Sequence, residues 1–227
     1  MSDNQNTDYY LNNYQKMMKQ GIVGSVFNVN RKMIERPFNK NQHFSKILEI
    51  AAYDDQHLKF TKCSYDTYYL SDINKIVIKF SKHYDPSKIK EIKIDANNLS
   101  RIETGIYDRI IVSCFVSHIN DLSTFLSELR RITKNYGYIS IYVPCEPGAL
   151  LRLVRSIINV PRSMVFFRKN HYDLVYSEHK IHYLSVKHMI RATYKNDLVL
   201  HRKFPFRYFS WNLNFWSIYT IQVNNTI

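Results

Sequence analysis

Lys46-Ile47-Leu48-Glu49-Ile50 is an apolar run with a carboxylate near its end, and two similar runs follow it. These are Tyr68–Asp72 and Ile92–Ala96, and each has an aspartate at or near its end. Successive carboxylates lie 23 residues apart, a distance that suits one strand and the crossover after it. Ligands of open α/β sheets bind outside the carboxyl ends of the strands, so the spacing predicts three carboxylates at one binding edge.

Strand and helix patterns keep alternating after these runs. A fourth strand is expected over Tyr107–Cys114 and a fifth over Gly137–Pro144, with an amphipathic helix over Asp121–Thr133 between them. The alternation predicts an α/β fold, with a Rossmann-like, doubly wound, mostly parallel sheet in three α/β/α layers and an antiparallel last strand. Other helices are expected over 9–20, 25–36, 55–63, 74–82, 148–159 and 185–195, with a break near Gly21 and Gly24 and a turn at Asn135–Gly137.

The length and the charge distribution indicate how the chain is organised. Its 227 residues suffice for one α/β domain with a full core. We expect an N-terminal helical cap over 1–43 and a main domain over 44–227 with a basic insertion at about 147–183. Residues 44–143 carry a net charge of only +2, whereas residues 144–210 carry 12 Lys/Arg against 4 Asp/Glu. The positive charge is therefore concentrated after the fifth strand, where such folds place a substrate-facing insertion.

Other features bear on the cellular compartment. No apolar run approaches the roughly 20 residues of a membrane span, and the polar N-terminus has no signal-peptide pattern. The three cysteines, Cys63, Cys114 and Cys145, form no metal-type pair, and their number is odd. We therefore expect a cytoplasmic protein without a disulfide framework.

The stretch Leu48-Glu49-Ile50-Ala51-Ala52-Tyr53-Asp54-Asp55 resembles the first-strand motif of the class I S-adenosylmethionine-dependent methyltransferases, Leu-Glu-Ile-Gly-x-Gly-x-Gly. The resemblance covers roughly residues 30–145 and is closest to the compact type that methylates small molecules, lipids or sugars. It implies S-adenosylmethionine as the cofactor. The acidic residue is retained, but the three glycine positions hold Ala51, Tyr53 and Asp55. Glycine permits positive φ and a close approach of backbone to ligand, so these replacements fall on the cofactor loop itself.

The resemblance also implies roles for individual residues. Glu49 is expected near the amino acid end of the cofactor, acting through the loop that contains Ala51 and Tyr53. Asp72 would accept hydrogen bonds from both ribose hydroxyls, which suits a carboxylate because it accepts two bonds and donates none. The Asp95-Ala96 pair would bind adenine, the acid through the exocyclic amine and the next backbone N–H through the ring. The segment that begins at Ser113 would pass beneath the transferred methyl group.

These residues also have a structural interpretation. A strand-terminal aspartate is often a helix N-cap or a turn former, and Asp54 and Asp55 can cap a following helix. For the loop two alternatives stay open. Either it follows another path and still binds the cofactor, or Tyr53 fills the methionine pocket and the protein is a catalytically inactive relative.

A hydroxyl acceptor would require a base, ideally a histidine with a pKa near neutrality. The candidates for this catalytic role are His118, His179 and His182, and the last two lie in a stretch that resembles a histidine-rich segment of several family members. The alternative is that they are surface histidines in a chain that has nine. The His179-x-x-His182 spacing has no evident third ligand, so no metal site is predicted.

The basic insertion allows three interpretations. It can bind an anionic acceptor, such as a nucleotide sugar, a lipid-linked glycan or a phospholipid headgroup. It can lie on a membrane surface through the basic amphipathic helix over 148–159. It can also be a solvated cap over the core. Nucleic acid ranks third among the acceptor classes because no RNA-binding module is visible.

Together these features predict a methyltransferase that acts on a small-molecule or glycan-linked acceptor, in a setting such as surface polysaccharide biosynthesis. The competing hypothesis is a catalytically inactive methyltransferase-like protein that serves as a binding or partner protein. The sequence predicts neither the methylated atom nor the oligomeric state.

Overall fold

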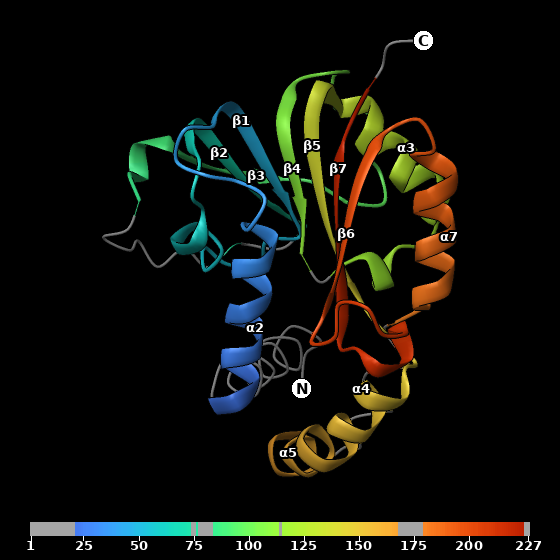
Figure 1. The fold of residues 1–227 in the computed structure, drawn as a ribbon. Helices are drawn as coiled ribbons and strands as arrows, with labels where there is room; N and C mark the ends of the chain where they lie inside the picture. Colours follow the sequence, from blue (N-terminus) through green and yellow to red (C-terminus); the bar gives the residue numbers. More distant parts are fainter. Residues whose placement is uncertain (1–20, 74–75, 77–83, 114, 168–178, 225–227) are drawn as a thin grey trace, which may run out of the picture.

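The computed structural model describes residues 21–73, 76, 84–113, 115–167 and 179–224, and Figure 1 shows how their helices and strands are arranged. The helix predicted over 9–20 lies outside the described residues, as do Cys114 and most of the helix predicted over 74–82.

Within the described residues, seven strands form one sheet in the order β3-β2-β1-β4-β5-β7-β6. The first five strands are parallel, β7 is antiparallel to β5, and β6 is antiparallel to β7. The predicted α/β class is therefore confirmed, including the antiparallel last strand. The strands are β1 (His43–Ile50), β2 (Ser64–Asp72), β3 (Ile89–Lys93), β4 (Tyr107–Val112), β5 (Thr133–Pro144), β6 (Leu198–Phe204) and β7 (Trp216–Gln222).

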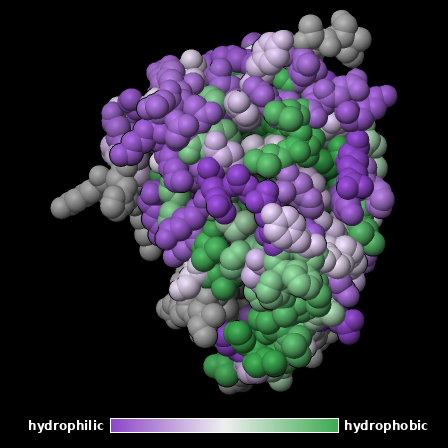
Figure 2. Space-filling model, in the orientation of Figure 1, coloured by the Kyte–Doolittle hydropathy of each residue, from purple (hydrophilic) through white to green (hydrophobic). Residues whose placement is uncertain are grey.

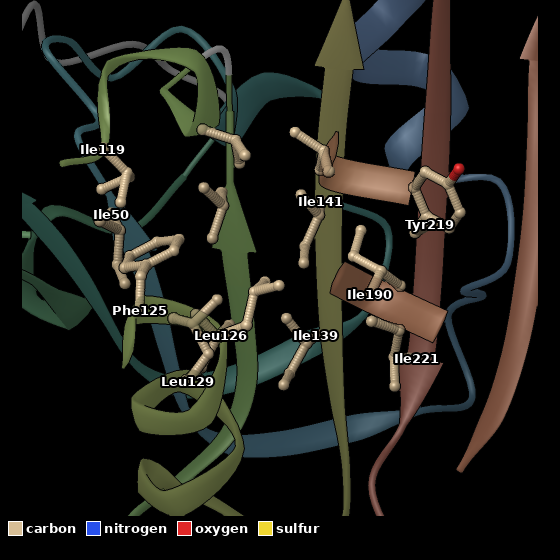
Figure 3. Packing of buried hydrophobic residues seen from close by; sticks show 14 of the residues in the cluster. Ile50, Ile119, Phe125, Leu126, Leu129, Ile139, Ile141, Ile190, Tyr219 and Ile221 are labelled. Atoms are coloured by element: carbon tan, nitrogen blue, oxygen red, sulfur yellow. The ribbon is translucent and has the colours of Figure 1, made fainter. Parts of the chain in front are cut away.

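Helices cover both faces of the sheet because successive strand residues point to opposite sides. On one face, α3 (Leu122–Ile132) and α7 (Tyr183–Thr193) pack over β4, β5 and β7, and Figure 3 shows the apolar side chains of this core. On the other face, α2 (Gly21–Ile34) and the turns after it cover a second core. Ile47 belongs to the second core and its neighbour Leu48 to the first, as the two-residue period of a strand requires.

The predicted apolar stripe of α3 is buried as expected, at Leu122, Phe125, Leu126, Leu129 and Ile132. Asp121 caps the helix, since its carboxylate accepts hydrogen bonds from the backbone N–H of Thr124 at 3.1 Å and from its hydroxyl at 2.6 Å. The helix predicted over Asp121–Thr133 from its amphipathic pattern and its N-cap is therefore confirmed.

A long helical stretch follows β5 at the carboxyl edge of the sheet and projects away from it (Figure 1). It consists of α4 (Ala149–Val154), the π-helical turn η4 (Arg155–Asn159) and α5 (Val160–Phe167). None of the described helices combines the length and the apolarity that crossing a bilayer requires. The short 3₁₀ turns are η1 (Leu58–Phe60), η2 (Pro86–Lys88), η3 (Val116–His118) and η5 (Trp211–Leu213).

Several predicted boundaries were wrong. The helix expected over 55–63 is only the turn η1, because this short crossover is shaped by side-chain contacts with α2 and not by helical periodicity. The turn expected at Asn135–Gly137 lies inside β5, where Tyr136 takes a φ of 61°. The break expected near Gly24 is absent, since α2 runs through that residue.

A buried ion pair fixes the end of α2 to the sheet. Arg109 of β4 is fully buried and donates from both terminal nitrogens to Glu35, at 3.0 and 2.7 Å. Its guanidinium group lies 3.8 Å from the ring centroid of Phe38. Residues 21–43 of the predicted cap therefore contribute to the core of the domain, through Ile34 and Phe38 among others. The domain boundary at residue 43 stays a prediction.

We predict that Arg109→Met lowers the free energy of unfolding by about 3–5 kcal/mol, because it leaves the buried Glu35 carboxylate without its partner. Chemical denaturation monitored by circular dichroism measures this. The double variant Arg109→Met/Glu35→Met removes both charges and is expected to recover part of the loss.

Lys134→Met is the control, since Lys134 bonds Asp108 at 2.8 Å in a pair that is partly exposed to solvent. That change is expected to cost less than about 1 kcal/mol. If Arg109→Met costs no more than Lys134→Met, the ion pair does not hold α2 to the sheet.

Candidate active site

The loop after β1 keeps a backbone path that normally requires glycine. Ala51 has a φ of 53° and Tyr53 a φ of 57°, both in the left-handed region. These are the first two glycine positions of the motif that the sequence resembles. A left-handed conformation costs a non-glycine residue roughly 1–2 kcal/mol. The loop therefore has left-handed backbone at two positions where the motif has glycine.

Asp55, at the third glycine position, has a structural role. It is buried, and its carboxylate accepts a hydrogen bond from the hydroxyl of Tyr84. Its carbonyl accepts the N–H of Leu58, which begins the turn η1. Asp54 is also buried, and its carboxylate accepts the N–H of Gln56 at 3.0 Å. Both aspartates thus stabilise the crossover locally.

Glu49 belongs to a buried polar network beneath this loop. Its carboxylate accepts a hydrogen bond from the Tyr68 hydroxyl at 2.7 Å and lies 3.6 Å from Nδ1 of His57. His57 Nε2 lies 2.8 Å from Glu35, the partner of Arg109. Burial raises the pKa of Glu49, although His57 and Tyr68 oppose the shift. Glu49 therefore faces this buried network, and its expected role near the amino acid end of the cofactor stays a prediction.

The same network holds Glu35 ionised. Burial alone would raise the pKa of its carboxyl group, but the charges of Arg109 and His57 and their hydrogen bonds lower it to about 2. Neither Glu35 nor His57 was a candidate from sequence. Both lie in segments that were expected to be helical. Their contact joins residues 22 positions apart, and no pattern in the neighbouring sequence indicates it.

Asp72 is the last residue of β2, as expected, and it is half-buried. Tyr53 lies near it. Burial and the nearby charges of Asp54 and Asp72 raise the pKa of the Tyr53 phenol. The side chain at the second glycine position thus lies within electrostatic range of the Asp72 carboxylate.

Asp95 lies beyond β3, which ends at Lys93, and begins a turn. Its carboxylate accepts the backbone N–H of Asn97 at 2.9 Å, and its carbonyl accepts the N–H of Asn98. The turn-forming interpretation of this aspartate is thus observed, and the next residue, Ala96, is buried. Ser113 directly follows β4, and its hydroxyl oxygen is buried without a hydrogen-bond partner among the described residues.

Two of the three candidate histidines meet at this edge. The rings of His118 and His179 are 4.7 Å apart between centroids and almost perpendicular. His179 Nδ1 lies 2.6 Å from the carboxylate of Glu146, which follows the end of β5. His182 is separate from this pair, exposed at the N-terminus of α7.

Glu146 is a site residue that the sequence analysis missed. It is buried, and it also forms an ion pair with Arg155. Burial would raise its pKa, but the hydrogen bond with His179 and the charge of Arg155 lower it to about 2. An ionised carboxylate can only accept, so Nδ1 of His179 carries the proton and Nε2 is the basic nitrogen. Glu49 and Asp72 were selected because they lie at or near the carboxyl ends of predicted strands. Glu146 follows the predicted strand Gly137–Pro144, so the same criterion would have selected it.

The segment around His179 is attached to the sheet by its backbone. Lys180 N–H donates to the carbonyl of Ser117 at 2.8 Å, and Tyr183 N–H donates to the carbonyl of Glu146 at 3.0 Å. Among the described residues, no group of three or more His, Cys, Asp and Glu side chains is placed to hold a metal ion. The edge thus combines carboxylates, one orphan hydroxyl and an oriented imidazole.

Comparisons with known proteins bear on the domain and on its fold. Residues 48–141 match the family model described as a methyltransferase domain. No curated protein sequence matches the chain significantly.

The solved structures of similar fold include three methyltransferases. The CurJ carbon methyltransferase has a TM-score of 0.57 at 14% identity, with 94% of this chain and 61% of that chain covered. A SAM-dependent methyltransferase from Archaeoglobus fulgidus has a TM-score of 0.56 at 15% identity, with 94% and 99% covered. Phosphoethanolamine N-methyltransferase 2 of Haemonchus contortus, in complex with S-adenosyl-L-methionine, has a TM-score of 0.54 at 13% identity, with 96% and 57% covered. The chain thus spans about three fifths of the first and third of these proteins, and the likeness is one of fold.

We predict that Ala51→Gly raises the free energy of unfolding by about 0.5–1 kcal/mol, because relief of the left-handed alanine outweighs the entropy that glycine loses. Ala52→Gly is the matched control at an ordinary φ and should lower stability by a similar amount. Thermal or urea unfolding of both variants measures the difference. Equal destabilisation by the two changes would mean that the loop is not held in this path.

A second prediction concerns the pH dependence of stability. The folded-state pKa of Glu146 is about 2, below its ordinary value of 4.5, so its contribution is full above 4.5 and is lost as the pH falls toward 2. The stability difference between the native protein and Glu146→Gln should therefore be largest above pH 4.5 and shrink below it. Urea unfolding across this range tests the prediction, with exposed Glu91→Gln as the control. A difference that does not vary with pH would contradict it.

Proposed function

The chain carries a class I methyltransferase domain, and we propose from this premise that it transfers a methyl group from S-adenosylmethionine to a small-molecule or glycan-linked acceptor. The observation that carries the proposal is the hydrogen bond between His179 and buried Glu146 at the edge where the first five strands end. This pair would provide an oriented base at the edge of the sheet where the cofactor is proposed to bind.

The described residues fit S-adenosylmethionine in three respects. The backbone at Ala51 and Tyr53 has the left-handed path that allows a ligand to approach closely. Asp72 offers a carboxylate at the end of β2 for a pair of hydroxyls. The buried hydroxyl of Ser113 has no hydrogen-bond partner in the part of the chain that the structure describes, and a bound ligand would provide one. Asp95 and Ala96, just beyond the end of β3, are proposed to bind adenine, although the Asp95 carboxylate also accepts the N–H of Asn97.

S-adenosylmethionine, when bound, supplies a methyl group on a sulfonium. The part left to this chain is to align an acceptor and to remove its proton. Nε2 of His179 would accept the proton of an acceptor hydroxyl or amine. Glu146 would keep the ring in the correct tautomer and stabilise the imidazolium that forms, while the ring of His118 packs against it.

The acceptor is proposed to be anionic. Residues 144–210 carry 12 Lys/Arg against 4 Asp/Glu, and their helical stretch begins directly after Glu146. A phosphate-bearing or carboxylate-bearing molecule would complement this charge. Surface polysaccharide biosynthesis is one setting that supplies acceptors of this type.

One observation favours a second function. The Tyr53 phenol lies close enough to Asp72 for the carboxylate charge to raise its pKa. If the ring stays there when ligand is present, the ribose position is closed. The protein would then be a catalytically inactive methyltransferase-like chain that binds a partner.

Calorimetric titration with S-adenosylhomocysteine tests the proposal. We predict micromolar binding to the native protein and a loss of roughly tenfold or more in Asp72→Ala, because two charge-assisted hydrogen bonds disappear. Tyr53→Ala should bind at least as tightly as the native protein.

Asp66→Ala is the control, since Asp66 is an exposed residue of the same strand that pairs with His43. It should leave the affinity unchanged. Absence of binding at millimolar ligand by the native protein, together with binding restored in Tyr53→Ala, would favour the inactive alternative. Absence of binding in both would remove the cofactor site from the account.

A further inference from the structure

The helical stretch after β5 exposes one apolar stripe to solvent. Exposed apolar side chains recur along α4, η4 and α5. Ile157 follows Leu153 by four residues, and Met164 and Val165 follow Ile157 by seven and eight. These spacings place the side chains on one side of the helix. Ile157 is 67% exposed and Val165 is 80% exposed. The stripe consists of Leu153, Ile157, Met164 and Val165. A helix of a globular domain normally turns such a stripe inward, so this one is available to a partner.

The loop between β6 and β7 adds aromatic rings to the same region. Tyr208 is 87% exposed, and Phe206 and Phe209 are exposed beside it. Hydrogen bonds to one buried side chain order this loop. Asn214 accepts the N–H of Phe206 at 2.7 Å and donates to the carbonyl of Ser210 at 2.8 Å. The backbone of the loop is therefore held in place while its aromatic rings are exposed to solvent.

The loop and the helix are joined at the carboxyl edge of the sheet. The backbone N–H of Ala149, the first residue of α4, donates to the side chain of Asn212 at 2.7 Å. Figure 2 shows hydrophobic residues gathered at the lower end of the molecule, where Figure 1 places α4 and α5. We call this surface the edge patch and define it as Leu153, Ile157, Met164, Val165, Phe206, Tyr208, Phe209 and Leu213.

The charge around the edge patch has one sign. The segments 147–167 and 198–215 carry no acidic residue and six basic ones, Arg152, Arg155, Arg162, Arg202, Lys203 and Arg207. Arg202 is close enough to Arg36 and Arg207 for their charges, added to its burial, to lower its pKa. Nη1 of Arg202 is buried without a hydrogen-bond partner among the described residues. Arg155 of this set pairs with Glu146, which directly precedes the first segment, and the excess of basic residues that remains favours an anionic partner.

We propose that the edge patch docks this protein onto an anionic phospholipid membrane. Apolar and aromatic side chains insert between headgroups, and the surrounding guanidinium groups attract the phosphates, which is how interfacial helices bind bilayers. Residues 144–210 carry 12 Lys/Arg against 4 Asp/Glu, so two copies that met through this surface would bring positive rims together. The net charge therefore favours an anionic lipid surface over a second copy.

Docking in this manner would bring the candidate site to the headgroup region. Arg155 of η4 is bonded to Glu146, the partner of His179, so the membrane-facing helix and the imidazole share one network. The proposal does not depend on methyl transfer, because it concerns a surface that is present without any cofactor.

Vesicle flotation of the full chain tests the proposal. We expect binding to vesicles of phosphatidylcholine mixed with phosphatidylglycerol, and roughly tenfold weaker binding to phosphatidylcholine alone or in high salt. Ile157→Asp/Val165→Asp should weaken binding to the mixed vesicles at least about tenfold. The control is Leu198→Asp, a residue that is 71% exposed at the opposite end of β6 and should have no effect.

A second variant leaves the apolar residues intact. Arg202→Gln/Arg207→Gln should lower binding to the mixed vesicles about tenfold without changing the weak binding to neutral ones. The proposal is overturned if the native protein does not float with mixed vesicles, or if Leu198→Asp weakens binding as much as Ile157→Asp/Val165→Asp. It is also overturned if sedimentation shows a dimer that the Ile157→Asp/Val165→Asp variant dissociates while vesicle binding is absent, since the patch would then join two copies.

Discussion

The loop that shapes the candidate site depends on a charge buried beneath it. Arg109 of β4 is fully buried, and its bonds to Glu35, together with the face of the Phe38 ring, compensate the loss of water around it. Glu35 also contacts His57, and His57 faces Glu49 at the end of β1. A chain of alternating charge and hydrogen bonding therefore runs from the helix to the loop. These contacts connect the end of α2 to Glu49, two residues before the loop begins at Ala51.

That anchoring explains how the loop can do without glycine. Ala51 and Tyr53 keep left-handed conformations that cost roughly 1–2 kcal/mol each, and the network fixed to Glu49 and His57 supplies the surrounding structure that holds them. The loop thus has left-handed backbone at two positions where the motif has glycine, and one of them carries the Tyr53 phenol, whose pKa burial and the charges of Asp54 and Asp72 raise. Whether that phenol moves aside decides between the two proposed functions.

Much of the fold followed from the sequence because its signals are local. The equal spacing of the strand-end carboxylates predicted parallel neighbours, and β1 does pair with β2 in register, with Ile50 opposite Ser71. The prediction of a helix over 55–63 was wrong because His57 bonds Glu35. This contact joins residues 22 positions apart, and the local sequence pattern does not indicate it. The pairing of His179 with Glu146 spans 33 residues and was missed for the same reason. Asp95 was placed at the correct edge, but its turn bonds could be seen only in the structure.

The central claim is that the cofactor binds at the edge near Asp72 and that the Tyr53 ring turns aside to admit it. A crystal structure of the protein grown with S-adenosylhomocysteine tests it most directly. The account predicts ribose hydroxyls on the Asp72 carboxylate, with the Tyr53 ring turned away from it. A structure in which the ring remains beside Asp72, with no ligand density at this edge, would contradict the account.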